Sequence, residues 1–279
     1  MTFVVPIRVA SGFAAAAIAC LVSAGARAQE ASPWIDDTYS SVRLIAGSRS
    51  GGTFLGGIAI QLQPGWKTYW RTPGDTGVPP RFDFSKSDNV ESVTILWPAP
   101  MKFPDGASGI SYGYQKHVLL PLRIIAKSAD KPVTLRASIS YAVCEKLCIP
   151  VDAQAELAFT GVASTQDSAI AAALDTVPKP AKIGDGTPLS VQDVRREGKL
   201  GVLVDIVAPE GKEIDLFVEG PTPDWALPVP KLVKPSPPGM RRFSFDLDGL
   251  PSGVSPEGAA LKLTVAAPGG AYEFNTILK

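Results

Sequence analysis

Two cysteines, Cys144 and Cys148, stand four positions apart in the run 141–150, and this spacing could carry redox chemistry. The third cysteine, Cys20, falls in an apolar leader, so a processed chain keeps only these two. Closing so small a ring removes about 2 kcal/mol of unfolded-chain entropy, against about 4.7 kcal/mol for a 100-residue loop. The pair is therefore a candidate for thiol–disulfide exchange rather than for stapling a fold.

The two cysteines need a turn between them before they can form a bond. Four residues of extended strand span about 13 Å, whereas a disulfide needs Cα atoms about 4.4–6.8 Å apart. Pro150 disfavours a helical conformation at Ile149, and the pair follows a strand-like run, 133–143. We therefore predict a tight loop or hairpin end that brings Cys144 and Cys148 together.

Two other interpretations of the pair stay open from the residues alone. The disulfide could be a local structural staple in a secreted β-domain. Cys144, Cys148 and the single histidine, His117, could also form a three-ligand site for Cu(I) or Zn(II). Lys146 beside the pair favours a thiolate and Glu145 opposes it, so local charge does not decide between these interpretations.

The N-terminal residues are typical of a cleavable secretory signal. Arg8 supplies a positive charge, residues 9–24 are apolar, and residues 26–28 fit a small-x-small site, so we expect cleavage after Ala28. The alternative is a lipoprotein signal anchored at Cys20, but the three residues before Cys20 match a lipobox poorly. No later stretch is long and apolar enough to span a membrane. We expect a periplasmic protein without stable membrane insertion, in a compartment where disulfides persist.

Composition argues against several classes of function. The 27 Lys and Arg balance the 27 Asp and Glu, and losing Arg8 and Arg27 with the leader leaves a slightly acidic chain. Near-neutral charge argues against binding to nucleic acid and against strong adhesion to anionic lipid. A single histidine, without a Ser-centred elbow or a metal-binding His pair, argues against a hydrolase. Three methionines argue against a Met-rich copper carrier, and we expect no cofactor.

Short strand-like runs separated by turns fill the chain, which contains 26 Gly and 26 Pro. Runs such as 135–141 alternate apolar and polar residues, which is typical of a sheet with one solvent-facing side. We predict an all-β fold with two immunoglobulin-like β-sandwich domains in tandem, joined by a short helical and Pro-rich connector. The predicted boundaries are 1–28 for the signal peptide, 29–161 for the domain with the cysteine pair, 162–187 for the connector and 188–279 for the second, small β-sandwich. In the connector, residues 164–167 could cap one short helix that runs to Asp175.

Several motifs together resemble the periplasmic N-terminal domain of DsbD-type thiol:disulfide interchange proteins, and more closely the ectodomain of ScsB, the suppressor of copper sensitivity. The motifs are Trp66–Pro80, Trp97–Pro100, Tyr112–Tyr114 and Cys144–Pro150. The resemblance covers residues 38–161, and residues 188–279 resemble the second β-domain of the ScsB ectodomain. It implies an immunoglobulin-like fold whose cysteine pair passes reducing equivalents to periplasmic partners, and it implies a link to copper tolerance.

By position, the resemblance makes Cys144 and Cys148 the exchanging pair, with Cys148 as the attacking sulfur. It implies thioredoxin-fold periplasmic proteins as partners and a membrane-embedded protein as electron donor. The Tyr112–Tyr114 segment falls where the family has a cap loop over the active site. Tyr112, Tyr114 and Phe103 are therefore the candidates to shield the sulfurs. The chain would be a protein-disulfide reductase that needs an external electron donor, and whether it acts as an enzyme stays open.

The chain departs from the family pattern in three ways. It ends at Lys279 without membrane segments or a thioredoxin-like domain, so we expect the electron donor to be another protein. Three residues separate the cysteines where DsbD has five, which leaves the loop geometry and the potential undetermined. The cap phenylalanine of DsbD has no clear counterpart, and Ser111 sits near its place. The rival hypothesis is a binding module with a permanent disulfide, which presents a docking surface or a strand edge.

Overall fold

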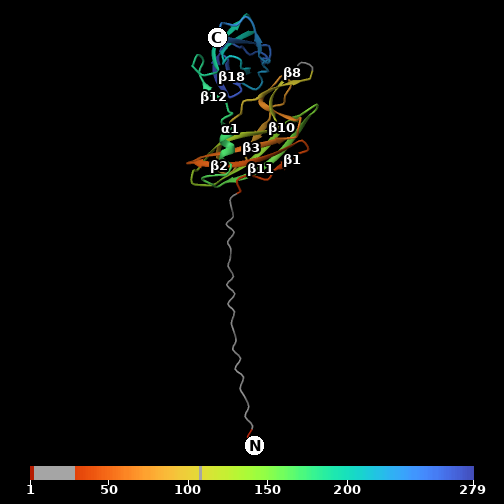
Figure 1. Cartoon of the computed structure of the whole chain (residues 1–279), viewed down its shortest axis with the longest axis vertical. Helices are drawn as coiled ribbons and strands as arrows, with labels where there is room; N and C mark the ends of the chain where they lie inside the picture. Colours follow the sequence, from red (N-terminus) through yellow and green to blue (C-terminus); the bar gives the residue numbers. More distant parts are fainter. Residues whose placement is uncertain (3–28, 107–108) are drawn as a thin grey trace.

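The computed structural model describes residues 1–2, 29–106 and 109–279, so residues 3–28 of the predicted signal peptide lie outside it. Figure 1 shows two β-rich bodies that follow one another along the long axis, with helix α1 (Asp167–Leu174) against the first. No helix in the described ranges is long and apolar enough to cross a membrane. The fold is all-β with two tandem sandwiches, which confirms the predicted fold class.

The first body is a sandwich of two antiparallel sheets that enclose one core. The first sheet has the order β1-β2-β3-β9-β6, formed by β1 (Ile35–Asp36), β2 (Ser40–Ser50), β3 (Thr53–Leu62), β9 (His117–Ala126) and β6 (Val90–Ile95). The second has the order β11-β10-β4-β8-β7, formed by β11 (Cys148–Phe159), β10 (Val133–Cys144), β4 (Lys67–Gly74), β8 (Gly109–Gln115) and β7 (Met101–Asp105), with β5 (Arg81–Asp83) beside β10. Phe54, Trp70 and Phe159 are among the large side chains buried between the sheets.

Strict alternation of side chains explains why β10 and β11 lie flat on the core with one face in solvent. In β11, every second residue from Val151 to Phe159 is buried and the residues between them are exposed. In β10, Leu135, Ala137 and Ile139 are buried in the same rhythm. Successive side chains of a strand point to opposite faces, so this period of two buries one whole apolar face. The alternation expected from the sequence over 135–141 is confirmed.

Helix α1 follows the first sandwich and packs on it. The Asp167 carboxylate accepts hydrogen bonds from the backbone N–H groups of Ser164 and Ser48, at 3.0 and 2.7 Å, and thereby joins the helix start to β2. Ile170 is 1% exposed and holds the helix against the sheet. The predicted short helix in this stretch is confirmed, with Asp175 as its C-cap.

The second body is a smaller sandwich of two four-stranded sheets. One sheet has the order β12-β19-β18-β15, formed by β12 (Lys179–Ala181), β19 (Gly270–Ile277), β18 (Ala260–Ala267) and β15 (Asp215–Glu219). The other has the order β13-β14-β17-β16, formed by β13 (Ser190–Glu197), β14 (Gly201–Val207), β17 (Met240–Asp246) and β16 (Lys231–Val233). The core includes Val204, Leu263 and Phe274. Strand β12 lies inside the stretch expected as a connector and pairs in parallel with β19.

Candidate redox site

The two cysteines close the end of a long β-hairpin. Strands β10 and β11 pair without a shift from Val133 opposite Phe159 to Cys144 opposite Cys148, and three residues form the loop between them. The Cα atoms of the two cysteines are 4.2 Å apart and their sulfurs are bonded. The hairpin end predicted from the spacing is therefore confirmed. The disulfide stands at the last paired position, where the hairpin opens into its loop.

The two cysteines differ in their access to solvent. Cys144 is 2% exposed, whereas Cys148 is exposed. The sheet order explains the difference, because β10 has β4 on its other side and Cys144 pairs there with Lys67. Strand β11 lies at the edge of its sheet, so Cys148 has no neighbouring strand beyond it. One cysteine is thus open to solvent and the other is protected.

Tyr69 of β4 touches both sulfurs. Its hydroxyl donates a hydrogen bond to Cys144 Sγ at 2.8 Å and lies 3.2 Å from Cys148 Sγ. Tyr69 is 2% exposed, and it forms a small buried cluster with Ala142 and Cys144. Burial, with a further contribution from the Asp105 carboxylate, raises the pKa of Tyr69 to about 12. The phenol therefore stays protonated, and remains a hydrogen-bond donor, at any physiological pH.

A buried lysine organises the polar groups next to Tyr69. Lys67, two residues earlier on the same strand, places its ammonium 3.0 Å from Asp105 Oδ2 and 3.0 Å from Ser111 Oγ. Thr76 also donates to Asp105 Oδ2 at 3.0 Å. Burial raises the pKa of Asp105, but the hydrogen bonds from Lys67 and Thr76 outweigh it and hold this pKa below its usual range. Asp105 therefore stays ionised and its charge is neutralised by Lys67.

The turn after β4 covers the ring of Tyr69. Gly77 lies so close that a Cβ atom there would stand 2.7 Å from Cδ1 of Tyr69, and 2.3 Å from Cβ of Pro73. Thr76 of the same turn is bound to Asp105, as described above, and Asp75 exchanges backbone and side-chain hydrogen bonds with Ile110. A glycine is thus required at 77 because the backbone itself packs on the aromatic ring.

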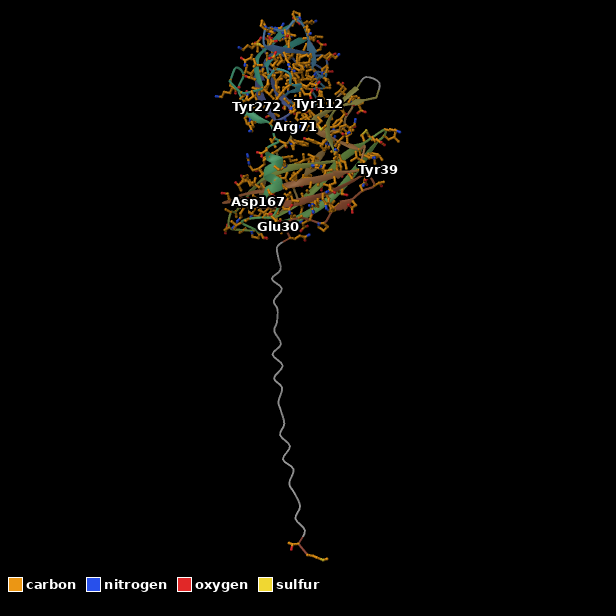
Figure 2. The ribbon with its side chains drawn as sticks, in the orientation of Figure 1. Glu30, Tyr39, Arg71, Tyr112, Asp167 and Tyr272 are labelled. Atoms are coloured by element: carbon orange, nitrogen blue, oxygen red, sulfur yellow. A yellow bond between two sulfur atoms is a disulfide. The ribbon has the colours of Figure 1, made fainter. Side chains whose placement is uncertain are left out.

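The three predicted shielding residues stand on β7 and β8, the strands that follow β4 in the sheet order. Tyr112 is 3% exposed and its ring meets Phe217 of the second sandwich at 4.7 Å between centroids; Figure 2 shows it where the two bodies meet. Tyr114 donates to the carbonyl oxygen of Pro98 at 2.8 Å. The ring of Phe103 lies 5.7 Å from the Lys67 ammonium. The hydrogen bonds to the sulfurs come from Tyr69, and shielding by the other three residues stays a prediction.

Sequence reasoning did not single out Tyr69, although it lies within the Trp66–Pro80 motif. The available signal was the alternation of β4, which sets Lys67 and Tyr69 on the same face of the strand. Pairing of Lys67 with Cys144 then brings this face to the cysteines. That pairing joins residues far apart in the sequence, so local patterns could not predict it.

The structure does not bring together the metal ligands considered from the sequence. His117 begins β9, which belongs to the opposite sheet from the cysteines. Within residues 29–106 and 109–279, no group of three or more His, Cys, Asp or Glu side chains could hold a metal ion. The geometry at the cysteines is that of a disulfide with a phenol donor.

Fold and site together define a disulfide-bearing, immunoglobulin-like β-sandwich whose cysteine pair ends a hairpin. Residues 41–160 match the model of one protein family, the N-terminal domain of the thiol:disulfide interchange protein DsbD. The first sandwich therefore matches this family's model over most of its length, which confirms the resemblance seen in the sequence motifs.

Comparison with solved structures extends the likeness to both sandwiches. The N-terminal periplasmic domain of ScsB from Proteus mirabilis matches with a TM-score of 0.72 and 22% sequence identity, over 89% of this chain and 98% of that chain. At this identity the likeness concerns the fold. A marsupial T cell receptor also matches at 13% identity, over 87% of this chain and 98% of that chain, with a TM-score of only 0.23. No curated protein sequence matches the chain.

Proposed function

We propose that the protein is a periplasmic thiol–disulfide exchange protein that passes reducing equivalents to thioredoxin-fold partners through Cys144 and Cys148. The observation that carries the proposal is the unequal pair at the hairpin end, with one cysteine exposed and the other buried against a phenol donor. Exchange requires a sulfur with access to the partner for the attack and a second sulfur within reach to resolve the mixed disulfide.

A purely structural role explains the disulfide less well. Strands β10 and β11 already pair through twelve consecutive positions, so the hairpin is held without the bond. The bond closes a ring of five residues, which stabilises the folded state by only about 2 kcal/mol in the chain-entropy model. The match of the first sandwich to the model of the DsbD N-terminal family adds independent support for exchange.

The proposed reaction starts from the reduced pair. The Cys148 thiolate attacks one sulfur of a partner disulfide, so that a mixed disulfide forms and the other partner sulfur leaves as a thiolate. The Cys144 thiolate then attacks Cys148 Sγ, which forms the intramolecular bond and releases the second partner sulfur. The partner gains two electrons and two protons, and the pair is oxidised by two electrons. A dithiol protein must then reduce the pair again by the same steps in reverse.

Tyr69 contributes to the resolving step in this mechanism. A hydrogen bond to an ionised acceptor is stronger than one to a neutral acceptor. The hydroxyl that lies on Cys144 Sγ in the disulfide would therefore bind the thiolate more strongly after reduction. This favours the thiolate form of Cys144 and so raises the fraction of nucleophile at neutral pH.

The cellular setting follows from the same proposal. The predicted signal peptide, with cleavage after Ala28, would deliver the chain to the periplasm. A membrane-embedded electron donor would keep the pair reduced. A role in copper tolerance would follow if copper-induced disulfides were the natural substrates. The family match and the fold of the ScsB periplasmic domain support this setting.

Single cysteine variants test the exchange mechanism. With Cys144→Ser, the exposed Cys148 still attacks but nothing resolves, so an oxidised thioredoxin-fold protein should be captured as a covalent complex, visible by intact mass. With Cys148→Ser, the remaining sulfur is buried and capture should be at least tenfold lower. Higher capture by Cys148→Ser would reverse the assignment of the attacking sulfur, equal capture would remove the distinction between the two sulfurs, and no capture by either would leave the binding module as the better explanation.

The reduction potential of the cysteine pair distinguishes a redox-active pair from a structural disulfide. Equilibration of the protein in thiol buffers, with free thiols counted by mass, should give a value of roughly −180 to −270 mV, the range of exchange proteins. A value below about −300 mV would mark the bond as structural.

A further inference from the structure

The second sandwich forms hydrogen bonds with β4 directly after Tyr69, at Arg71 and Thr72. Glu219 of β15 accepts two hydrogen bonds from the Arg71 guanidinium, from Nε at 2.9 Å and from Nη2 at 2.7 Å. Glu273 of β19 accepts a further one from Nη2 at 2.7 Å, and Thr72 donates to Glu219 at 2.9 Å. Figure 2 shows Arg71 between the two bodies.

This ion cluster is largely removed from solvent. The side chains of Arg71, Glu219 and Glu273 are 20%, 14% and 22% exposed. Burial lowers the pKa of Arg71, but the hydrogen bonds and charges of the two carboxylates outweigh it and raise this pKa. A bidentate pair of guanidinium and carboxylate fixes orientation as well as distance. The contact therefore sets where this part of β4 stands.

An aromatic side chain of the second sandwich reaches into the core of the first. Phe217 is 0% exposed and belongs to the first core, with its ring centroid 5.6 Å from that of Trp70 and 4.7 Å from that of Tyr112. Trp70 stands on β4 and Tyr112 on β8, so one ring joins the two strands. Lys102 of β7 also pairs with Asp215 at 2.9 Å.

The contacts from the second sandwich fall on the part of β4 that lacks strand partners. The register of β4 with β8 holds through Tyr69 opposite Gly113 and resumes only at Gly74 opposite Ser111. Its pairing with β10 is limited to Lys67 and Thr68. Among the described residues, 70–73 therefore have no strand partner on either side. Side chains of the second sandwich supply the restraint that the sheet does not.

We propose that Arg71 and Phe217 are positioning residues for the redox site, through which the second sandwich holds the Tyr69 hydroxyl on Cys144 Sγ. Tyr69 and Arg71 are two residues apart on one strand, about 7 Å along it. A shift of the Arg71 end consequently moves the phenol relative to the sulfurs. The biological meaning of this inference rests on the proposed function, whereas the predicted effect on reduction can be measured on the disulfide alone.

The direction of the effect follows from the hydrogen bond. When β4 loosens, the thiolate of the reduced pair loses its phenol donor, while the disulfide loses a weaker bond to a neutral acceptor. The reduced form is then the more destabilised. The disulfide should therefore become harder to reduce.

The test is the equilibrium between the Cys144–Cys148 disulfide and dithiothreitol, read by mass, in the full-length chain with Arg71→Met. We expect the equilibrium constant to shift about tenfold toward the disulfide, which corresponds to about 30 mV for a two-electron couple. Arg71→Lys should recover part of the shift. Glu219→Gln and Phe217→Leu should shift the constant in the same direction, and either serves if Arg71→Met does not fold.

The matched control is Arg242→Met. Arg242 is 18% exposed and makes the same two-pronged contact, to Asp205, but within the second sandwich. The Arg242→Met variant should have a lower melting temperature, and its equilibrium constant should stay within twofold of that of the unmodified chain.

A double variant separates positioning from general loosening. In a Tyr69→Phe background, Arg71→Met should cause no further shift, because the phenol through which it acts is gone. A full shift in that background, or an unchanged constant for both Arg71→Met and Phe217→Leu, would overturn the inference. Because dithiothreitol replaces the partner, failure of partner capture would count against the proposed function and leave this result standing.

Discussion

The residues at the disulfide differ in their burial and in their contacts. Cys148 is exposed on an edge strand, Cys144 is buried beside β4, and Tyr69 binds the buried sulfur. Lys67 and Asp105 neutralise one another next to this phenol. A neutral donor beside a sulfur stabilises a thiolate without adding a charge that burial would penalise. In the proposed mechanism, Tyr69 would raise the reactivity of the buried cysteine in this way.

The raised pKa of Tyr69 has a consequence for stability at high pH. The folded state holds the phenol proton up to about pH 12, whereas the unfolded chain releases it near pH 10. The protonated phenol thus contributes its full stability below pH 10, and this stability is lost as pH rises toward 12. We expect Tyr69→Phe to remove about 1 kcal/mol of the loss in unfolding free energy between pH 9 and pH 11.

Urea unfolding at these two pH values measures the difference. Both proteins contain the other tyrosines, so their contribution cancels in the comparison. The same pH dependence in Tyr69→Phe and in the unmodified chain would show that Tyr69 titrates normally.

At the scale of elements, the hairpin β10–β11 ends at the disulfide, and a short loop follows the last paired position. Its three-residue loop presents Leu147, whose side chain is 76% exposed and directly precedes the accessible Cys148. A partner sulfur that approaches Cys148 must come close to this apolar side chain. Apolar contact around a reactive disulfide would favour a protein partner over a small thiol.

We predict that Leu147→Ser slows exchange with a thioredoxin-fold protein severalfold and leaves reduction by dithiothreitol unchanged. Stopped-flow or quenched-mass kinetics with both reductants provide the measurement. Leu200→Ser, at an apolar position that is 46% exposed in the second sandwich, is the matched control. Equal slowing with both reductants would assign Leu147 to loop structure instead of partner contact.

At the scale of the whole molecule, the two sandwiches behave as one unit around β4. Phe217 fills the first core although it belongs to the second sandwich, and the Arg71 cluster closes the same interface. Loss of a buried phenylalanine costs about 3–5 kcal/mol when the cavity stays open. Here the cavity would form in the core of the other domain.

We predict that Phe217→Ala weakens the protection of β4 and β8 against amide hydrogen exchange, although both strands lie in the other sandwich. Exchange followed by mass spectrometry on the full chain measures this. Phe274→Ala, at a position 0% exposed in the core of the second sandwich, should loosen that sandwich alone. If Phe217→Ala loosens β15 and leaves β4 and β8 protected, the two domains are independent.

Local sequence patterns were enough to predict the all-β class, the short helix before Asp175 and the hairpin end at the cysteines. These features depend on signals within a few residues of each other: alternation, turn residues and the distance that a disulfide can span. The motifs of residues 66–80 and 144–150 were distinctive enough to indicate the family as well.

Three features became visible only in the folded chain: which cysteine is buried, that Tyr69 binds its sulfur, and that Phe217 enters the first core. The fold also separated His117 from the cysteines by placing it on the opposite sheet. Each of these depends on which strands become neighbours. A strand pattern shows which face of a strand is buried, but the partner of that face is chosen by packing between segments tens to hundreds of residues apart.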